Sequence, residues 1–142
     1  MSDPGEELAR HKAVLAEGRH LLSSFVTREV HVDGADLALE IDIDETMTNP
    51  RGGLQGGLLA TLADIVGGRM AMEGLDDQKS IVVTSDMTVH YLGSVTKTAH
   101  AVGHILRRGR RAIVCLVEVY DQRGGPLCAA CQLAFTVVTP RT

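Results

Sequence analysis

The sequence contains no tryptophan, and aromatic residues make up only 3% of its 142 residues. Proteins that grip single-stranded nucleic acid usually stack the bases on aromatic side chains, which this chain can hardly supply. Its formal net charge of -4 also lacks the positive excess that binding to a phosphate backbone requires. The composition therefore argues against a nucleic-acid partner.

Long apolar runs and a secretory leader are missing too. No apolar stretch reaches the roughly 20 residues that a membrane-spanning helix needs. The N-terminal segment MSDPGEELARHK lacks the basic region followed by an apolar region that a signal peptide would have. We therefore expect a soluble, cytoplasmic protein with no membrane partner.

Cysteine is scarce, with only Cys115, Cys128 and Cys131 in the chain. An odd number without a secretory context indicates reduced thiols. Cys128 and Cys131 form a C-x-x-C, but residues three apart on a strand point to opposite faces and could not clasp one metal ion. We expect buried structural thiols and no metal site.

Regular apolar periodicity covers most of the chain. Acidic residues and a proline near the start predict a helix over residues 3–17. Patterns typical of strands, bounded by turn residues, recur at six places. The predicted strands cover residues 25–32, 37–43, 81–92, 96–106, 112–120 and 127–138. Short connections between the last four predict antiparallel neighbours.

Residues 56–74 differ from the rest, because they are apolar on nearly every side as far as Gly68 and are broken only by Thr61 and Asp64. This pattern predicts a long buried helix. Glycines weaken a helix, so their presence here predicts close approach of neighbouring groups. The glycines concerned are Gly56, Gly57, Gly67 and Gly68.

Six strands and one long apolar helix together predict an α+β fold, an antiparallel six-stranded sheet wrapped around the central helix with an additional N-terminal helix. The length fits one domain over residues 1–142, in which residues 1–19 form a helical extension. Such a sheet has open edges, and a symmetric dimer would protect them.

The glycine-rich loop that leads into residue 56 is a candidate binding site. Free N–H groups at the start of a helix, together with the helix dipole, suit a carbonyl oxygen that gains negative charge during attack. The alternative is a plain tight turn into a core helix.

Asp64 is the second candidate, since a carboxylate within an apolar helix is costly to bury alone. In a water-poor cleft it would serve as a general base or nucleophile. Two structural alternatives stay open: a pair with Arg69, although five residues is poor helical spacing for one, or a locally exposed stripe. Gly56 and Asp64 lie about 12 Å apart along a helix. If both serve one reaction, they come from different subunits of a dimer.

The segment NPRGGLQGGLLATLAD, residues 49–64, resembles hotdog-fold thioesterases of the phenylacetate-degradation branch. That branch has an Asn, then His-Gly-Gly six residues later, then an Asp on the following helix. This chain has Asn49, Gln55-Gly56-Gly57 and Asp64 at matching spacing. The strand patterns after the helix are also similar, so the resemblance covers about residues 20–138.

The resemblance implies a role for each matching residue. Asp64 would be the base or nucleophile for thioester hydrolysis. The Gly56 N–H would bind the thioester oxygen, and the neighbouring Gly57 would also contact the substrate. Asn49 would position the attacking water or the thioester, and Thr84 would lie near that water.

Gln55 stands where the family usually has His. A Gln amide still donates a hydrogen bond but cannot titrate, so the position can polarise a carbonyl but cannot move a proton. The substitution also leaves room for altered substrate choice or lost activity.

Four arginines, Arg107, Arg108, Arg110 and Arg111, flank a predicted hairpin turn. They could bind the phosphates of CoA, or they could form a solvated hairpin tip. The resemblance implies an aryl or aliphatic acyl-CoA as substrate, no cofactor beyond the CoA of the substrate itself, and a homodimer, or a dimer of dimers, that forms the active site. Two other functions stay open, a hotdog dehydratase or hydratase and a non-catalytic acyl-CoA-binding module.

Overall fold

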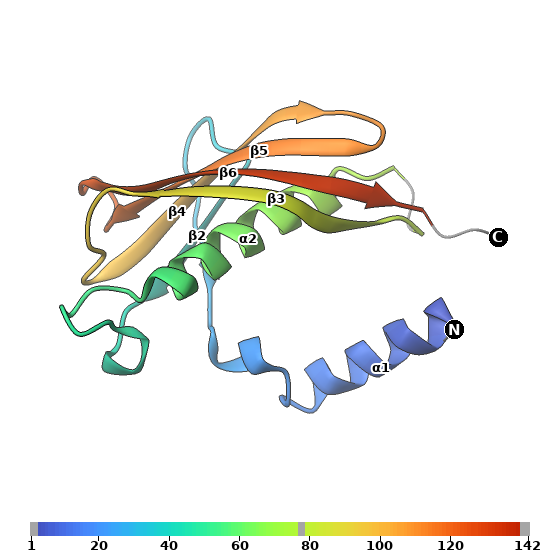
Figure 1. The fold of residues 1–142 in the computed structure, drawn as a ribbon, viewed down its shortest axis with the longest axis horizontal. Helices are drawn as coiled ribbons and strands as arrows, with labels where there is room; N and C mark the ends of the chain where they lie inside the picture. Colours follow the sequence, from blue (N-terminus) through green and yellow to red (C-terminus); the bar gives the residue numbers. More distant parts are fainter. Residues whose placement is uncertain (1–2, 77–78, 140–142) are drawn as a thin grey trace.

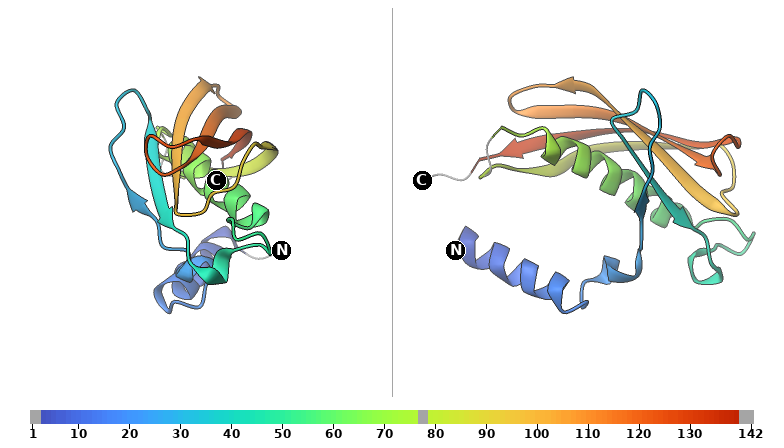
Figure 2. Two further views of the ribbon diagram at one scale, coloured as in Figure 1. Left: turned by 90° about the vertical axis from the view of Figure 1, so that its left-hand side faces the viewer. Right: turned by 180° about the vertical axis from the view of Figure 1, so that it is seen from behind.

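In a computed structural model, residues 3–76 and 79–139 of the chain are described. A long helix, α2 (Gly56–Glu73), lies against one face of a six-stranded sheet that arches over it (Figure 1). A shorter helix, α1 (Pro4–Ala16), lies on the side of α2 away from the sheet (Figure 2). Both helices were predicted. No helix in the described ranges is long and apolar enough to cross a membrane.

The sheet is antiparallel throughout, in the order β1-β2-β4-β5-β6-β3. Its strands are β1 (Arg28–Glu29), β2 (Leu37–Asp42), β3 (Ile81–Tyr91), β4 (Thr98–Arg108), β5 (Ala112–Asp121) and β6 (Leu127–Val138). The remaining elements are two short 3-10 helices, η1 (Leu21–Ser24) and η2 (Glu45–Met47). This is the α+β hotdog arrangement that the sequence predicted, with β3 at one edge of the sheet.

The strand predicted over residues 25–32 is wrong in length, because β1 holds only Arg28 and Glu29. Beyond it, Val30 still donates to the Ala38 carbonyl at 3.0 Å, but the chain then leaves the sheet and turns at Gly34, whose φ is +82°. The last four strands match their predicted ranges within two residues at each end.

The central helix is buried on one face in this chain rather than on all sides. Its seven buried residues are Leu59, Leu62, Ala63, Val66, Gly67, Met70 and Ala71. Close approach is confirmed at Gly67, where a Cβ would lie 2.9 Å from the Phe135 ring and 3.0 Å from Cys115 Sγ. At Gly68 a Cβ would meet only an ordinary contact of 3.7 Å.

A β-bulge interrupts β3 between Thr84 and Asp86. The extra residue, Ser85, donates its hydroxyl to the Ala134 carbonyl at 3.0 Å. A bulge shifts the alternation of side chains by one residue. Even-numbered residues therefore point to one face of the sheet before the bulge, and odd-numbered residues point to that same face after it. This shift decides which β3 side chains face α2.

Candidate active site

The start of α2 carries two backbone donors without acceptors in the described part of the chain, the N–H groups of Gly56 and Gly57. Gln55 is the N-cap, in extended conformation, and its Oε1 accepts from the Leu58 N–H at 3.1 Å. The amide oxygen is thereby engaged in capping, which leaves the NH₂ group of Gln55 as the donor that this side chain can offer a ligand.

Asn49 organises the loop that delivers the chain to this helix start. Its Oδ1 accepts from the backbone N–H of Arg51 at 2.9 Å and of Gly53 at 3.3 Å. Its own N–H donates to the Gly53 carbonyl at 2.8 Å, and buried Leu54 then donates to the Val95 carbonyl at 2.7 Å. The side chain oxygen of Asn49 therefore folds the loop, and its NH₂ group remains to donate.

Asp64 lies two turns further along α2, half-buried, and accepts a 2.6 Å hydrogen bond from the Thr84 hydroxyl. Sequence reasoning put both residues in the site, and the structure brings them together. Arg69 is not the partner of Asp64, because its guanidinium reaches Glu29 at 3.3 Å and Glu73 at 3.5 Å. One hydroxyl donor leaves most of the acceptor capacity of the carboxylate for water or substrate.

The three cysteines are buried and free, as predicted. Burial raises the pKa of Cys115 to about 11, and the nearby charge of Asp64 adds to this rise. Burial alone raises the pKa of Cys131 to about 11. Since the thiolate is the nucleophilic form, neither group is a nucleophile at neutral pH. Within residues 3–76 and 79–139, no three His, Cys, Asp or Glu side chains gather in a way that could hold a metal ion.

The arginine-rich hairpin between β4 and β5 divides into two kinds of residue. Arg108 donates to the carbonyls of Ala71 and Met70, both at 3.0 Å, at the C-terminal end of α2. A Cβ on Gly74 would lie 2.1 Å from the Arg108 guanidinium carbon, so that glycine makes room for the contact. Arg108 therefore caps the helix. All four arginines of the hairpin are exposed, and Arg108 differs from the other three in its contacts with the α2 carbonyls.

A family profile described as Thioesterase superfamily matches residues 52–128, more than half of the chain. This range begins in the loop folded by Asn49 and includes α2, β3, β4 and β5. The chain belongs to the thioesterase superfamily. A search of the curated proteins found no significant match to this chain.

Several solved structures are similar to this chain in fold. A Haemophilus influenzae thioesterase superposes with a TM-score of 0.77 at 19% identity, over 89% of this chain and 88% of that one. A Bacillus halodurans protein solved with CoA gives 0.74 at 27% identity, over 99% and 98%. A Streptococcus mutans protein bound to acetyl CoA gives 0.70 at 21% identity, over 82% and 92%.

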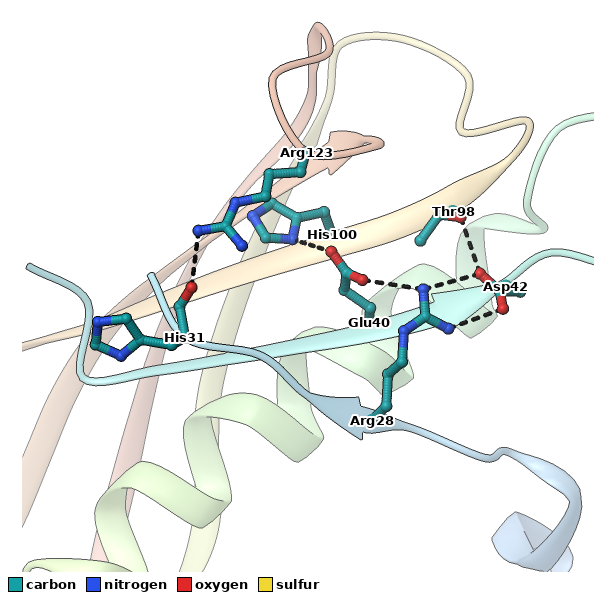
Figure 3. A network of polar contacts seen from close by, with 7 residues as sticks. All are labelled: Arg28, His31, Glu40, Asp42, Thr98, His100 and Arg123. Carbon is teal, nitrogen blue, oxygen red and sulfur yellow. Dashed lines mark hydrogen bonds and ion pairs between the residues drawn. The ribbon is translucent and has the colours of Figure 1, made fainter. Parts of the chain in front are cut away.

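Sequence reasoning missed a polar network on the face of the sheet away from α2 (Figure 3). Buried His100 and Glu40 are joined by a 2.6 Å contact between Nδ1 and Oε2. Glu40 also accepts from Arg28 at 2.9 Å, and Arg28 binds Asp42 through two further bonds. The strand predicted around His100 is confirmed, and the neighbouring strand register pairs Glu40 with His100 directly. The alternation of side chains along β2 could have shown that Glu40 faces away from the core. Its partner His100 could be found only once the register between the two strands was known.

Tyr91 was also missed. At the end of β3 its hydroxyl donates to the Gly56 carbonyl at 2.7 Å, directly at the start of α2.

Of the residues that the sequence singled out, Thr84 and Asp64 meet at one point on α2. Gln55, Gly56 and Gly57 meet at another, two turns away along the same helix.

Proposed function

We propose that this chain is an acyl-CoA thioesterase, which cleaves the thioester of an aryl or aliphatic acyl-CoA to the free acid and CoA. The observation that carries the proposal is the Asp64 carboxylate, half-buried on α2 and bonded, among the residues that the structure describes, to the Thr84 hydroxyl alone. Membership of the thioesterase superfamily supports it. So do the similar folds from B. halodurans and S. mutans, which were solved with CoA and acetyl CoA.

The chemistry assigned to each group follows from its contacts. The two free N–H groups at the start of α2 receive the thioester oxygen, where negative charge builds up during attack. As a general base, Asp64 removes a proton from the water that attacks the carbonyl carbon, and the thiolate of CoA leaves. As a nucleophile, Asp64 attacks the carbonyl carbon itself, the thiolate leaves, and water then hydrolyses the resulting anhydride to the free acid. Thr84 orients the carboxylate. Asn49 and Gln55 donate from their NH₂ groups toward the thioester or the water.

Gln55 favours hydrolysis over hydration among the hotdog reactions. A dehydratase or hydratase needs a side chain that gives up and takes back a proton, normally His beside a carboxylate. Gln55 occupies that position and cannot titrate. A non-catalytic acyl-CoA-binding module would use the same donors without turnover. The spacing from Asn49 to Asp64 supports a place for the chain in the phenylacetate-degradation branch.

A complete site requires two copies of the chain. Gly56 and Asp64 are separated by about 12 Å along α2, which is too far for one thioester group to contact both. Two antiparallel copies of α2 would bring the helix start of one subunit to Asp64 of the other. β3 supports this dimer, because no strand in residues 3–76 or 79–139 pairs with its outer edge and it carries exposed apolar side chains. These side chains are Ile81, Val83, Met87 and Tyr91.

Thiol release from a panel of acyl-CoAs tests the proposal, with a thiol-reactive dye as the readout. We expect the wild-type protein to release CoA from at least one aryl or aliphatic thioester, and Asp64→Asn to release none above background. Glu73→Gln, on the same helix but exposed, is the matched control and should retain the rate. Binding of CoA without thiol release would favour the non-catalytic module, and loss of enoyl absorbance without thiol release would favour the hydratase.

Mixed dimers test the shared site. Asp64→Asn is combined with a second inactive variant, Asn49→Ala with Gly56→Leu, whose Cβ would already contact the Tyr91 ring at 3.4 Å and whose longer side chain would crowd the helix start. Each mixed dimer has one site with all lesions and one with none, so random assembly restores about a quarter of the wild-type activity. If confirmed mixed dimers stay inactive, the groups act within one subunit and the site assignment is wrong.

A further inference from the structure

Tyr91 contacts the peptide group at the start of α2 that carries one of the two free donors. Its hydroxyl donates to the Gly56 carbonyl at 2.7 Å, and its ring lies 3.4 Å from the position of a Cβ on Gly56. The Gly56 carbonyl and the Gly57 N–H belong to the same peptide unit. In a trans peptide these two groups point in opposite directions, so the hydroxyl lies behind the donor and not in its path.

A hydrogen bond to the carbonyl changes the N–H at the other end of the peptide. It polarises the unit, and hydrogen bonds in a chain strengthen one another. It also fixes the rotation of the peptide plane, which at the first turn of a helix is otherwise held only by later residues. The Gly57 N–H thereby becomes a stronger and better-aimed donor toward an oxygen that gains negative charge.

The bulge in β3 makes this contact possible together with the one at Asp64. Thr84 and Tyr91 are seven residues apart, so on a regular strand they would point to opposite faces. The bulge between Thr84 and Asp86 shifts the parity, and the partners on β6, Phe135 and Ala129, are six apart. Both side chains therefore face α2, one at the carboxylate and one at the helix start.

We infer that Tyr91 is a positioning residue of the thioester site, which holds the Gly56–Gly57 peptide so that the Gly57 N–H donates to the thioester oxygen as a second donor beside the Gly56 N–H. The inference rests on the proposed function. Partial burial raises the pKa of Tyr91, so the hydroxyl keeps its proton and remains a donor at neutral pH.

Steady-state kinetics of Tyr91→Phe test the inference, and Tyr120→Phe is the matched control because these are the only two tyrosines. Tyr120 lies on β5, beside His100 on the opposite face of the sheet. For Tyr91→Phe we expect kcat to fall about threefold to tenfold with KM unchanged, since one neutral hydrogen bond that matters in the transition state is lost. Tyr120→Phe should retain both constants, and thermal melts should show that both variants fold.

The ¹⁵N resonance of Gly57 gives a readout that does not depend on turnover, because it responds to hydrogen bonding at the preceding carbonyl. In glycine-labelled protein it should move in Tyr91→Phe and stay in place in Tyr120→Phe. An unchanged kcat in Tyr91→Phe, or a raised KM at constant kcat, would overturn the inference while leaving the thioesterase proposal intact. A wild-type protein that hydrolyses no thioester of the panel would overturn both.

Discussion

Asp64 and Glu40 are two carboxylates that the fold treats in opposite ways. Glu40 is 9% exposed, and its two oxygens are taken by Arg28 and His100. Asp64 is half-buried and has one hydroxyl partner, Thr84. A buried carboxylate whose two oxygens both have hydrogen-bond partners holds strands together, and one with open acceptor positions can bind a water or attack a carbonyl.

The difference shows that burial alone does not identify a reactive group. Glu40 is the more deeply buried of the two, and every contact it makes joins neighbouring strands of the sheet. Asp64 lies on the half-exposed face of α2, where a second chain or a substrate can reach it. The number of partners that a carboxylate has already acquired separates the two roles better than its depth.

The largest expected effect is on the activity of Asp64→Ala. Loss of the base or nucleophile should reduce turnover by at least about 10²-fold to 10⁴-fold. The melting temperature should stay close to that of the wild type, because Thr84 is the one hydrogen-bond partner of the carboxylate in the described part of the chain. A variant that keeps most of its rate on a good substrate would show that Asp64 is not the catalytic carboxylate.

Glu40→Gln should give the reverse pattern. Removal of the charge between Arg28 and His100 should lower the free energy of unfolding by about 2–3 kcal/mol, measured by urea denaturation. Activity of the folded fraction should persist. Asp42→Asn is the control within the same network, and its loss should be much smaller because the Asp42 side chain is 68% exposed. Equal losses at both positions would contradict the importance of burial here.

Thr84→Val should reduce kcat about tenfold by removing the donor that orients Asp64, with little change in stability because Thr84 is exposed. Thr84→Ser keeps the hydroxyl and should retain most of the rate. A valine variant that keeps the wild-type rate while the serine variant is slow would show that packing of the methyl group, and not the hydrogen bond, is what matters.

Gln55→His should have the smallest effect. His can cap a helix through Nδ1, as His20 does at the start of η1, where it accepts from the Leu22 N–H at 3.1 Å. The rate should therefore change by less than about tenfold, whereas Gln55→Ala should lose the cap and about 1 kcal/mol of stability. Unfolding of the His variant in a thermal melt would mean that Gln55 is a packed structural residue.

The fold could be predicted well wherever periodicity is strong. The four strands from residue 81 onward are long runs of strand-forming residues separated by clear turn residues, and their predicted ranges are confirmed to within two residues. The prediction over residues 25–32 failed because apolar alternation there continues past the point where the chain leaves the sheet. Nothing local distinguishes Val30 from a true strand residue.

The site could be predicted in part. The resemblance implied that Thr84 lies near the attacking water and that Asp64 is the catalytic carboxylate, and the structure places the two side chains in hydrogen-bond contact. Tyr91 and the Glu40–His100 pair could not be predicted, because both depend on which face a strand residue occupies. For Tyr91 that face is set by the bulge at Thr84, and for His100 by its register with Glu40. The role of Arg108 as a helix cap depends on the same kind of long-range placement.

The position of Tyr91 gives the protein an optical reporter. The chain has no tryptophan, so its emission on excitation in the tyrosine absorption band comes from its two tyrosines. One of these rings lies against Gly56, and its hydroxyl is bonded to the backbone there. Any molecule that occupies the start of α2 changes the surroundings of that fluorophore, while Tyr120 on the opposite face supplies a steady background. In a Tyr120→Phe protein the entire emission reports on this one peptide group.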